Sequence, residues 1–148
     1  MDKKKYEALC FRAKAGDILL KITRSEMEIG MKNVLFIASE AVPFIKTGGL
    51  ADVVGALPKY FNKDEFDVRV MIPKYTCIPW EYREKMVYKT HFYIDLAWRT
   101  QYVGVFEMEY QGVTFYFIDN EFYFSGPKPY SWIHEDIEKF AFFSKAAL

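Results

Sequence analysis

Apolar runs alternate with polar, glycine-containing segments after residue 30, and this pattern predicts an α/β unit. The run Val34–Ala38 is continuous, which is typical of a parallel strand buried on both faces, so we expect a central strand there. A second strand is expected over Asp67–Ile72, closed by Pro73.

The segment between these strands has the periodicity of a helix. Its apolar positions fall on one helical face, and Pro58 should kink or shorten the helix. Strand, helix and strand in succession predict a βαβ unit with a parallel sheet. The expected buried face consists of Leu50, Val53, Val54, Leu57 and Phe61.

The second half of the chain has a different pattern. Tyr102–Tyr110 and Val113–Asp119 are strand-like and joined through Gln111-Gly112, which predicts a β-hairpin, either as an antiparallel insertion or within a mixed sheet. Helical spacing returns from Ile133 and continues to the last residue without a stop signal. We therefore expect a final helix that exposes apolar side chains, namely Phe140, Phe142, Phe143 and Leu148.

Residues 1–30 differ from the remainder. Gly16 and Gly30 interrupt their weak helical and apolar patterns, and Met31 precedes the first strong strand pattern. We expect an N-terminal extension of unknown role over 1–30, whose removal leaves residues 31–148 folded.

Composition limits the classes of protein to which the chain can belong. Its 148 residues are 51% hydrophobic and 19% aromatic, which suits one packed domain. The 20 basic and 20 acidic residues balance, so no net field favours nucleic acid or an anionic membrane as a partner. Cys10 and Cys77 have neither disulfide-framework nor zinc-ligand spacing, and no apolar run approaches the ~20 residues of a membrane span. A cytoplasmic protein is expected.

The loop between the first strand and the helix carries the candidate chemistry. Ligands of open α/β sheets bind at the carboxyl ends of strands. The adjacent Gly48 and Gly49 should allow positive φ and close approach of a ligand, and the helix beginning near Leu50 should offer amides to an anion. Lys46 adds a positive charge. These features predict a phosphate-sugar site, although a solvated lysine beside a glycine turn would give the same pattern.

The motif Lys46–Val53, with Gly55–Pro58 after it, resembles the signature near the start of bacterial glycogen synthases and plant starch synthases. Further blocks in the same order resemble this family, and the resemblance covers residues 31–148. These blocks are Ser39–Phe44, Val68–Tyr75, Phe117–Glu121 and Phe140–Ser144.

The resemblance implies a partial Rossmann-like N-terminal domain of a GT-B glycosyltransferase of family 5. Such an enzyme transfers glucose from ADP-glucose to the non-reducing end of an α-1,4-glucan with retention, without a metal or other cofactor. Lys46 would contact the sugar nucleotide, with Gly48 and Gly49 as further donor-binding residues. The main catalytic residues and the C-terminal GT-B domain are expected beyond Leu148, so this chain alone should be inactive.

Further polar and aromatic residues have more than one expected role. Glu40, Thr47 and Asp52 are possible supporting residues; Glu40 and Asp52 could form a glycosidase-like pair, but structural roles are favoured. Trp132 and Tyr130 could stack on glucan or pack in the core.

Three interpretations of the function stay open. They are the ADP-glucose enzyme, a UDP-glucose-dependent GT-B relative, and a non-catalytic module that binds glucan or a partner. The sequence departs from the family at Lys139, where many members have arginine, and in the Ser125–Pro129 loop.

Overall fold

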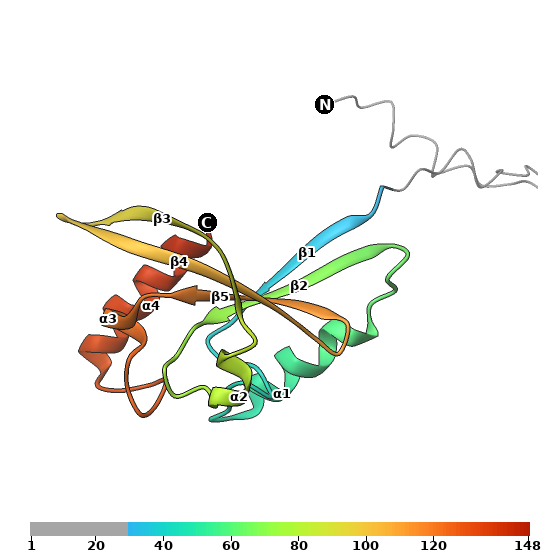
Figure 1. Cartoon of the computed structure of the whole chain (residues 1–148), viewed down its shortest axis with the longest axis horizontal. Helices are drawn as coiled ribbons and strands as arrows, with labels where there is room; N and C mark the ends of the chain where they lie inside the picture. The colour runs from blue at the N-terminus through green and yellow to red at the C-terminus, as the bar shows by residue number, and fades with distance from the viewer. Residues whose placement is uncertain (1–29) are drawn as a thin grey trace, which may run out of the picture.

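The computed structural model describes residues 30–148, and the expected extension lies almost wholly outside them. Strands and helices alternate first and are followed by a run of strands (Figure 1). In chain order the elements are β1 (Lys32–Ile37), α1 (Gly49–Ala56), the 3₁₀ helix η3 (Leu57–Tyr60), β2 (Phe66–Pro73), α2 (Trp80–Arg83), β3 (Val87–Leu96), β4 (Arg99–Tyr110), β5 (Val113–Asp119), α3 (Glu121–Phe124) and α4 (Ile133–Ala147).

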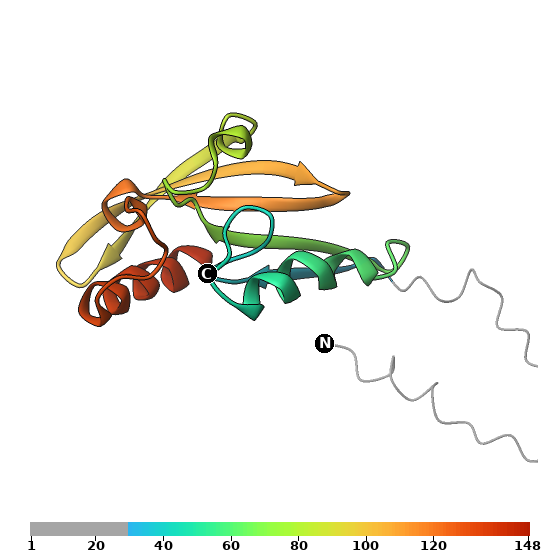
Figure 2. The ribbon, with the colours of Figure 1, turned by 90° about the horizontal axis from the view of Figure 1, so that it is seen from below.

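One five-stranded mixed sheet in the order β1-β2-β5-β4-β3 forms the centre of the fold. β1 pairs parallel with β2, and β2 pairs parallel with β5, so three strands end at the same edge of the sheet. β4 and β3 continue the sheet in antiparallel pairing. In the turned view, α1 lies beside the β1–β2 end and α4 beside the end formed by β3 and β4 (Figure 2). The expected α/β class and βαβ unit are confirmed.

β1 occupies an edge of this sheet, so the expectation of a central strand buried on both faces was wrong. Within residues 30–148 its only strand partner is β2, and Leu35 and Ile37 are 42% and 47% exposed. The apolar run correctly marked a strand. Apolar composition alone cannot show whether a strand has neighbours on both sides.

Pro58 ends α1, as expected, and the chain continues as η3 with this proline near its first position. The buried face of the helix differs from the expected one, because Leu50, Val53 and Leu57 are all about half exposed. The residues that α1 and η3 bury are mostly small: Ala51, Val54, Gly55 and Pro58. Close packing against the preceding loop therefore determines the orientation of α1 more than side-chain size does.

The β4–β5 hairpin turns where it was predicted, at Gln111 and Gly112. Both residues have positive φ, 50° and 75°, as a tight two-residue hairpin turn requires. The hairpin is part of the main sheet and not an insertion outside it, because β5 pairs directly with β2. Sequence reasoning missed β3, whose polar and aromatic residues are almost all exposed.

Aromatic rings fill the core. Phe44 is 1% exposed and makes edge-to-face contacts with four rings, those of Tyr82, Tyr110, Phe115 and Phe117. On α4, Phe142 and Phe143 are 0% and 4% exposed, which corrects the expectation that they face solvent. Phe142 stacks on Tyr123 at 4.5 Å, so the short α3 supplies the partner that was not foreseen. Leu148 is fully exposed, as expected.

No helix within residues 30–148 is long and apolar enough to cross a membrane.

Candidate functional site

Polar residues follow the carboxyl ends of the three parallel strands. Ser39 and Glu40 follow β1, Lys74 follows β2, and Asn120 follows β5. The ladder extends slightly beyond the strands, with Ala38 donating to the Met71 carbonyl and Lys74 to the Ile118 carbonyl. This edge of the sheet is where an open α/β fold binds its ligands. The predicted site residues lie in the loop that leaves it from β1 and in the first turn of α1.

Glu40 is the buried acid of this loop, 3% exposed, and it binds the loop's own backbone. Its Oε2 accepts from the Thr47 amide at 2.6 Å and from the Thr47 hydroxyl at 2.7 Å. One carboxylate therefore joins the two ends of residues 38–48, which we call the Glu40 loop. These two hydrogen bonds, both to Oε2, place Glu40 to hold the loop together.

Lys46 and Asp52 form an ion pair across the beginning of α1. The Lys46 Nζ lies 2.8 Å from Asp52, and both side chains are about half exposed. The contact holds the ammonium group near the helix N-terminus. An exposed pair of this kind contributes only about 0–1 kcal/mol to stability, so breaking it changes the free energy of unfolding little. The cation thus remains available to an approaching anion.

Gly48 and Gly49 begin α1 without the positive φ that was expected. Gly48 is extended, with φ −153°, and neither glycine is among the described residues with positive φ. What they provide is space: a Cβ on Gly49 would meet no atom within 4 Å, and one on Gly48 only Glu40 Oε1 at 3.9 Å. No side chain caps the helix. The first-turn amides of α1 are therefore accessible to a ligand anion.

Gly55 is the glycine whose importance the sequence analysis missed. A Cβ there would lie 2.3 Å from Val42 Cγ2 and 2.6 Å from the Val42 carbonyl oxygen. The Val42 amide also donates to the Ala51 carbonyl at 3.1 Å. Gly55 thus allows α1 to pack directly on the backbone of the Glu40 loop, which places the helix N-terminus beside Lys46.

A second cation stands at the same edge of the sheet and was given no role from the sequence. Lys74 Nζ pairs with Asp119 at 3.0 Å and lies 4.1 Å from the centre of the Phe106 ring. Both side chains of this pair are mostly buried, 20% and 16% exposed. The pairing of β2 with β5 brings these residues together, and the sequence alone did not predict that pairing.

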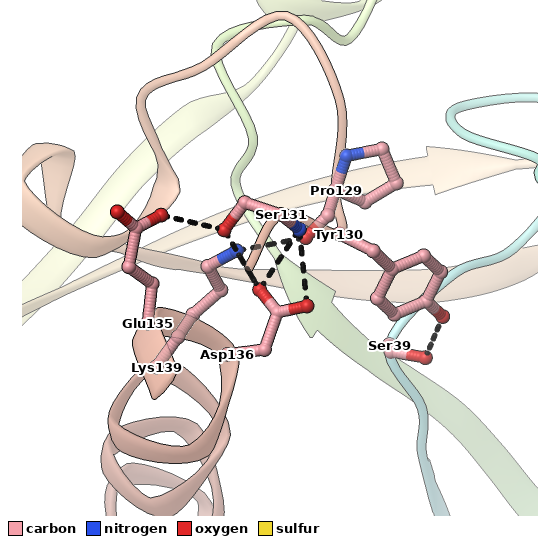
Figure 3. A network of polar contacts seen from close by, with 7 residues as sticks. All are labelled: Ser39, Pro129, Tyr130, Ser131, Glu135, Asp136 and Lys139. Atoms are coloured by element: carbon pink, nitrogen blue, oxygen red, sulfur yellow. Dashed lines mark hydrogen bonds and ion pairs between the residues drawn. The ribbon is translucent and has the colours of Figure 1, made fainter. Parts of the chain in front are cut away.

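A polar network at the beginning of α4 borders the site (Figure 3). Lys139 Nζ donates to Asp136 at 2.7 Å and to the Pro129 carbonyl at 3.0 Å. Asp136 also accepts from the Ser131 amide and hydroxyl, and Ser131 donates to Glu135. We call these five residues the α4 network. It anchors the end of the Ser125–Pro129 loop that the sequence analysis noted as unusual.

Tyr130 joins this network to the Glu40 loop. It lies between Pro129 and Ser131, and its hydroxyl is 2.6 Å from the Ser39 hydroxyl (Figure 3). The ring packs at 5.7 Å from Phe140. Tyr130 is therefore part of the support of the site.

Trp132, the remaining aromatic candidate, is separate from this support, and so are His91 and His134. Trp132 is 79% exposed at the beginning of α4. His91 stacks on Tyr102 and shares a hydrogen bond with Tyr88 on the hairpin. His134 is exposed in the first turn of α4. Among the described residues, none of these three side chains forms a hydrogen bond or a ring contact with the Glu40 loop.

The α4 network should make the chain sensitive to acid. Burial opposes ionisation of Asp136, but hydrogen bonds from Lys139 and Ser131 outweigh it, so the pKa of this carboxyl lies below its ordinary 3.8. A lowered folded-state pKa stabilises the fold above the ordinary value, and this stabilisation disappears as the pH falls towards the folded-state pKa.

Asp136→Asn should accordingly lower the free energy of unfolding at neutral pH by about 2 kcal/mol, because Lys139 loses its charged partner. The difference from the parent chain should shrink as the pH falls below about 4. Urea unfolding of both proteins across this range measures it. If the difference in unfolding free energy between the two proteins does not change with pH, the charged Asp136 does not stabilise the fold in this way.

Comparison with known proteins identifies the family of this site. The family described as starch synthase catalytic domain matches residues 33–148. The glycogen synthase of Lachnospira eligens is 91% identical over 118 residues, which are 80% of this chain and 25% of that protein. The glycogen synthase of Lachnoclostridium phytofermentans is 68% identical over the same length and with the same coverage.

A solved structure has the same fold. The catalytic domain of starch synthase IV from Arabidopsis thaliana, bound to ADP and acarbose, matches with a TM-score of 0.62 and 25% identity. The match covers 79% of this chain and 24% of that one. The chain spans about a quarter of the length of the curated relatives it matches. These findings confirm the resemblance carried by the Lys46 motif and the partial Rossmann-like fold of a GT-B enzyme, and the chain belongs to the starch synthase catalytic domain family.

Proposed function

We propose that this chain is the donor-binding front part of a glycogen synthase that transfers glucose from ADP-glucose to the non-reducing end of an α-1,4-glucan with retention. The observation that carries the proposal is the uncapped beginning of α1, with open space over Gly48 and Gly49 and Lys46 held beside it. The names of the relatives support this activity, and the ADP and acarbose in the plant structure support a nucleotide and a glucan as ligands.

The chemistry of glucose transfer explains why such a site is useful. As the bond to glucose breaks, negative charge develops on the departing diphosphate. Helix amides and an ammonium group placed where that charge appears stabilise the transition state more than the ground state. Lys46 supplies the charge, the two glycines allow the phosphates to approach the backbone, and Glu40 with Thr47 keeps the loop in place. Asp52 orients Lys46.

The proposed enzyme is larger than this chain. Residues 31–148 form part of the first of two GT-B domains, and 1–30 form an extension in a cytoplasmic protein. The residues at the reacting centre belong to the three quarters of the relatives' length that this chain does not span. Activity is therefore proposed for a protein that includes that part, without metal or other cofactor.

A chimera tests the proposal. Residues 31–148 would replace the matching segment of the L. eligens glycogen synthase, and glucose incorporation into glycogen would be measured with ADP-glucose and with UDP-glucose. The expected result is transfer from ADP-glucose. A folded chimera without transfer from either donor would contradict the proposal.

A second candidate function is glucan binding through Trp132, favoured by its 79% exposure at the beginning of α4. If Trp132 stacks on glucose rings, Trp132→Ala should reduce retention of the 148-residue chain on glycogen. Trp98→Ala is the matched control, because Trp98 is 87% exposed at the far end of the β3–β4 hairpin. Equal retention of both variants would leave Trp132 without a role in binding.

A further inference from the structure

Lys139 is buried although the proposed transfer makes no direct use of its charge. Its side chain is 8% exposed, and Nζ has two partners, Asp136 and the Pro129 carbonyl. A buried ion pair usually adds little net stability over an apolar pair of similar size, because both charges lose their hydration. A contribution to stability is therefore a weak explanation for a buried lysine here. Its position next to the backbone around Tyr130 indicates a different role.

The α4 network fixes the backbone on both sides of Tyr130. Lys139 binds the carbonyl of Pro129, and the Ser131 amide donates to the two oxygens of Asp136 at 3.1 and 3.0 Å. Both neighbours are tied to α4, so the backbone at Tyr130 is held, and from there its ring reaches Ser39 (Figure 3). Its ring is supported further by packing against Phe140.

From Tyr130 a series of direct contacts leads to the proposed donor site. The Tyr130 hydroxyl bonds to Ser39 at 2.6 Å, Ser39 is followed by Glu40, and Glu40 binds Thr47 directly before Gly48. Each step is a hydrogen bond or a peptide bond. Contiguous contacts of this kind can transmit a change in position, although only a measured coupling establishes that they do.

We propose that Lys139 is a positioning residue for the Glu40 loop, acting through Tyr130. Lys139 ties Pro129 to α4 directly and Ser131 through Asp136, Tyr130 thereby meets Ser39, and the beginning of the Glu40 loop is held in the place that lets Glu40 reach Thr47. The effect on the loop depends only on these contacts. Its effect on catalysis rests on the proposed function.

The first measurement is amide hydrogen exchange in the full 148-residue chain, followed by NMR. Lys139→Met keeps the length of the side chain but removes both hydrogen bonds. It should accelerate exchange of the Thr47 amide about tenfold, with a much smaller change at Phe117 in the centre of β5. Lys139→Arg should restore most of the protection, because guanidinium can donate to both partners.

Lys145→Met is the matched control. It removes a lysine from the same helix, whose Nζ donates to the Asp95 carbonyl on β3 and not to the α4 network. Exchange at Thr47 should be unchanged. Equal acceleration at Thr47 and Phe117 in Lys139→Met would mean a general loss of stability and would overturn the proposal.

The second measurement asks whether Lys139 acts through Tyr130. Tyr130→Phe removes only the hydroxyl that meets Ser39, and it should accelerate Thr47 exchange by about the same factor as Lys139→Met. The double variant should be no faster than either single one. Additive acceleration would show two independent effects and would refute the route through Tyr130.

The third measurement uses the chimera with ADP-glucose. Lys139→Met should raise the apparent KM about tenfold with a smaller change in kcat, Lys139→Arg should recover most of it, and Lys145→Met should match the parent. A loosened loop in a chimera that transfers no glucose would overturn the proposed function and leave the positioning role supported. If the chimera is active but Lys139→Met changes neither the exchange rate of the Thr47 amide nor the KM, the positioning role alone is overturned.

Discussion

Lys46→Ala should reduce glucose transfer by the chimera about ten- to a hundredfold. A charge-assisted contact to a desolvated phosphate is worth about 1.5–3 kcal/mol, which corresponds to this factor in kcat/KM. Folding should hardly change, because Lys46 is about half exposed and its pair with Asp52 lies at the surface. Lys46→Arg should recover only part of the activity, since the planar guanidinium must fit beside Gly48 and Gly49.

Lys89→Ala provides the comparison for this experiment. Lys89 forms a similarly exposed ion pair with Glu107 at 3.1 Å, on the β3–β4 hairpin. Its loss should leave both the melting temperature and the transfer rate nearly unchanged. If Lys46→Ala transfers glucose with the same kinetics as the parent chimera, Lys46 does not bind the donor. If its melting temperature falls as much as its activity, Lys46 is a structural residue.

Gly55→Ala should destabilise the fold by about 3 kcal/mol, although alanine normally favours helices over glycine by about 0.5–1 kcal/mol. The added Cβ would lie 2.6 Å from the Val42 carbonyl oxygen, a backbone atom that cannot rotate away. Either α1 or the Glu40 loop must move. For a domain of this size the melting temperature should fall by about 10 °C.

The same substitution at Gly49 should not destabilise the fold. A Cβ added at Gly49 meets no atom within 4 Å, and the residue begins α1 with an ordinary backbone, so Gly49→Ala should be neutral or slightly stabilising. Thermal unfolding of both variants is the measurement. Similar melting temperatures for the two variants would show that the contact between α1 and Val42 is not as tight as described.

Local patterns predicted the order of elements well. The apolar runs predicted β1 and β2, Pro58 predicted the end of α1, and Gln111-Gly112 predicted the hairpin turn. Each of these depends on residues that are adjacent in sequence, since runs, breakers and turns act on the backbone within a few positions.

What the sequence could not predict depends on contacts between distant segments. The pairing of β2 with β5 turned the expected hairpin into part of the main sheet, and it brought Lys74 to Asp119. Because α1 packs on Val42, it buries the face that carries Ala51 and Gly55, and the larger apolar side chains of the helix stay about half exposed. For the proposed site, the motif indicated the loop, but the space over Gly48 and Gly49 and the support from Tyr130 required three-dimensional positions.

The two edges of the sheet differ in how readily they can accept another strand. β3 is interrupted between Tyr88 and Thr90 and carries Lys89 there, and such irregularity and charge discourage pairing with a further chain. β1 begins with Lys32 but has no such interruption, and Val34, Leu35, Phe36 and Ile37 follow one another along an edge that is unpaired within residues 30–148. Within the part of the chain that the structure describes, the β1 edge is therefore the one that accepts a further strand more readily.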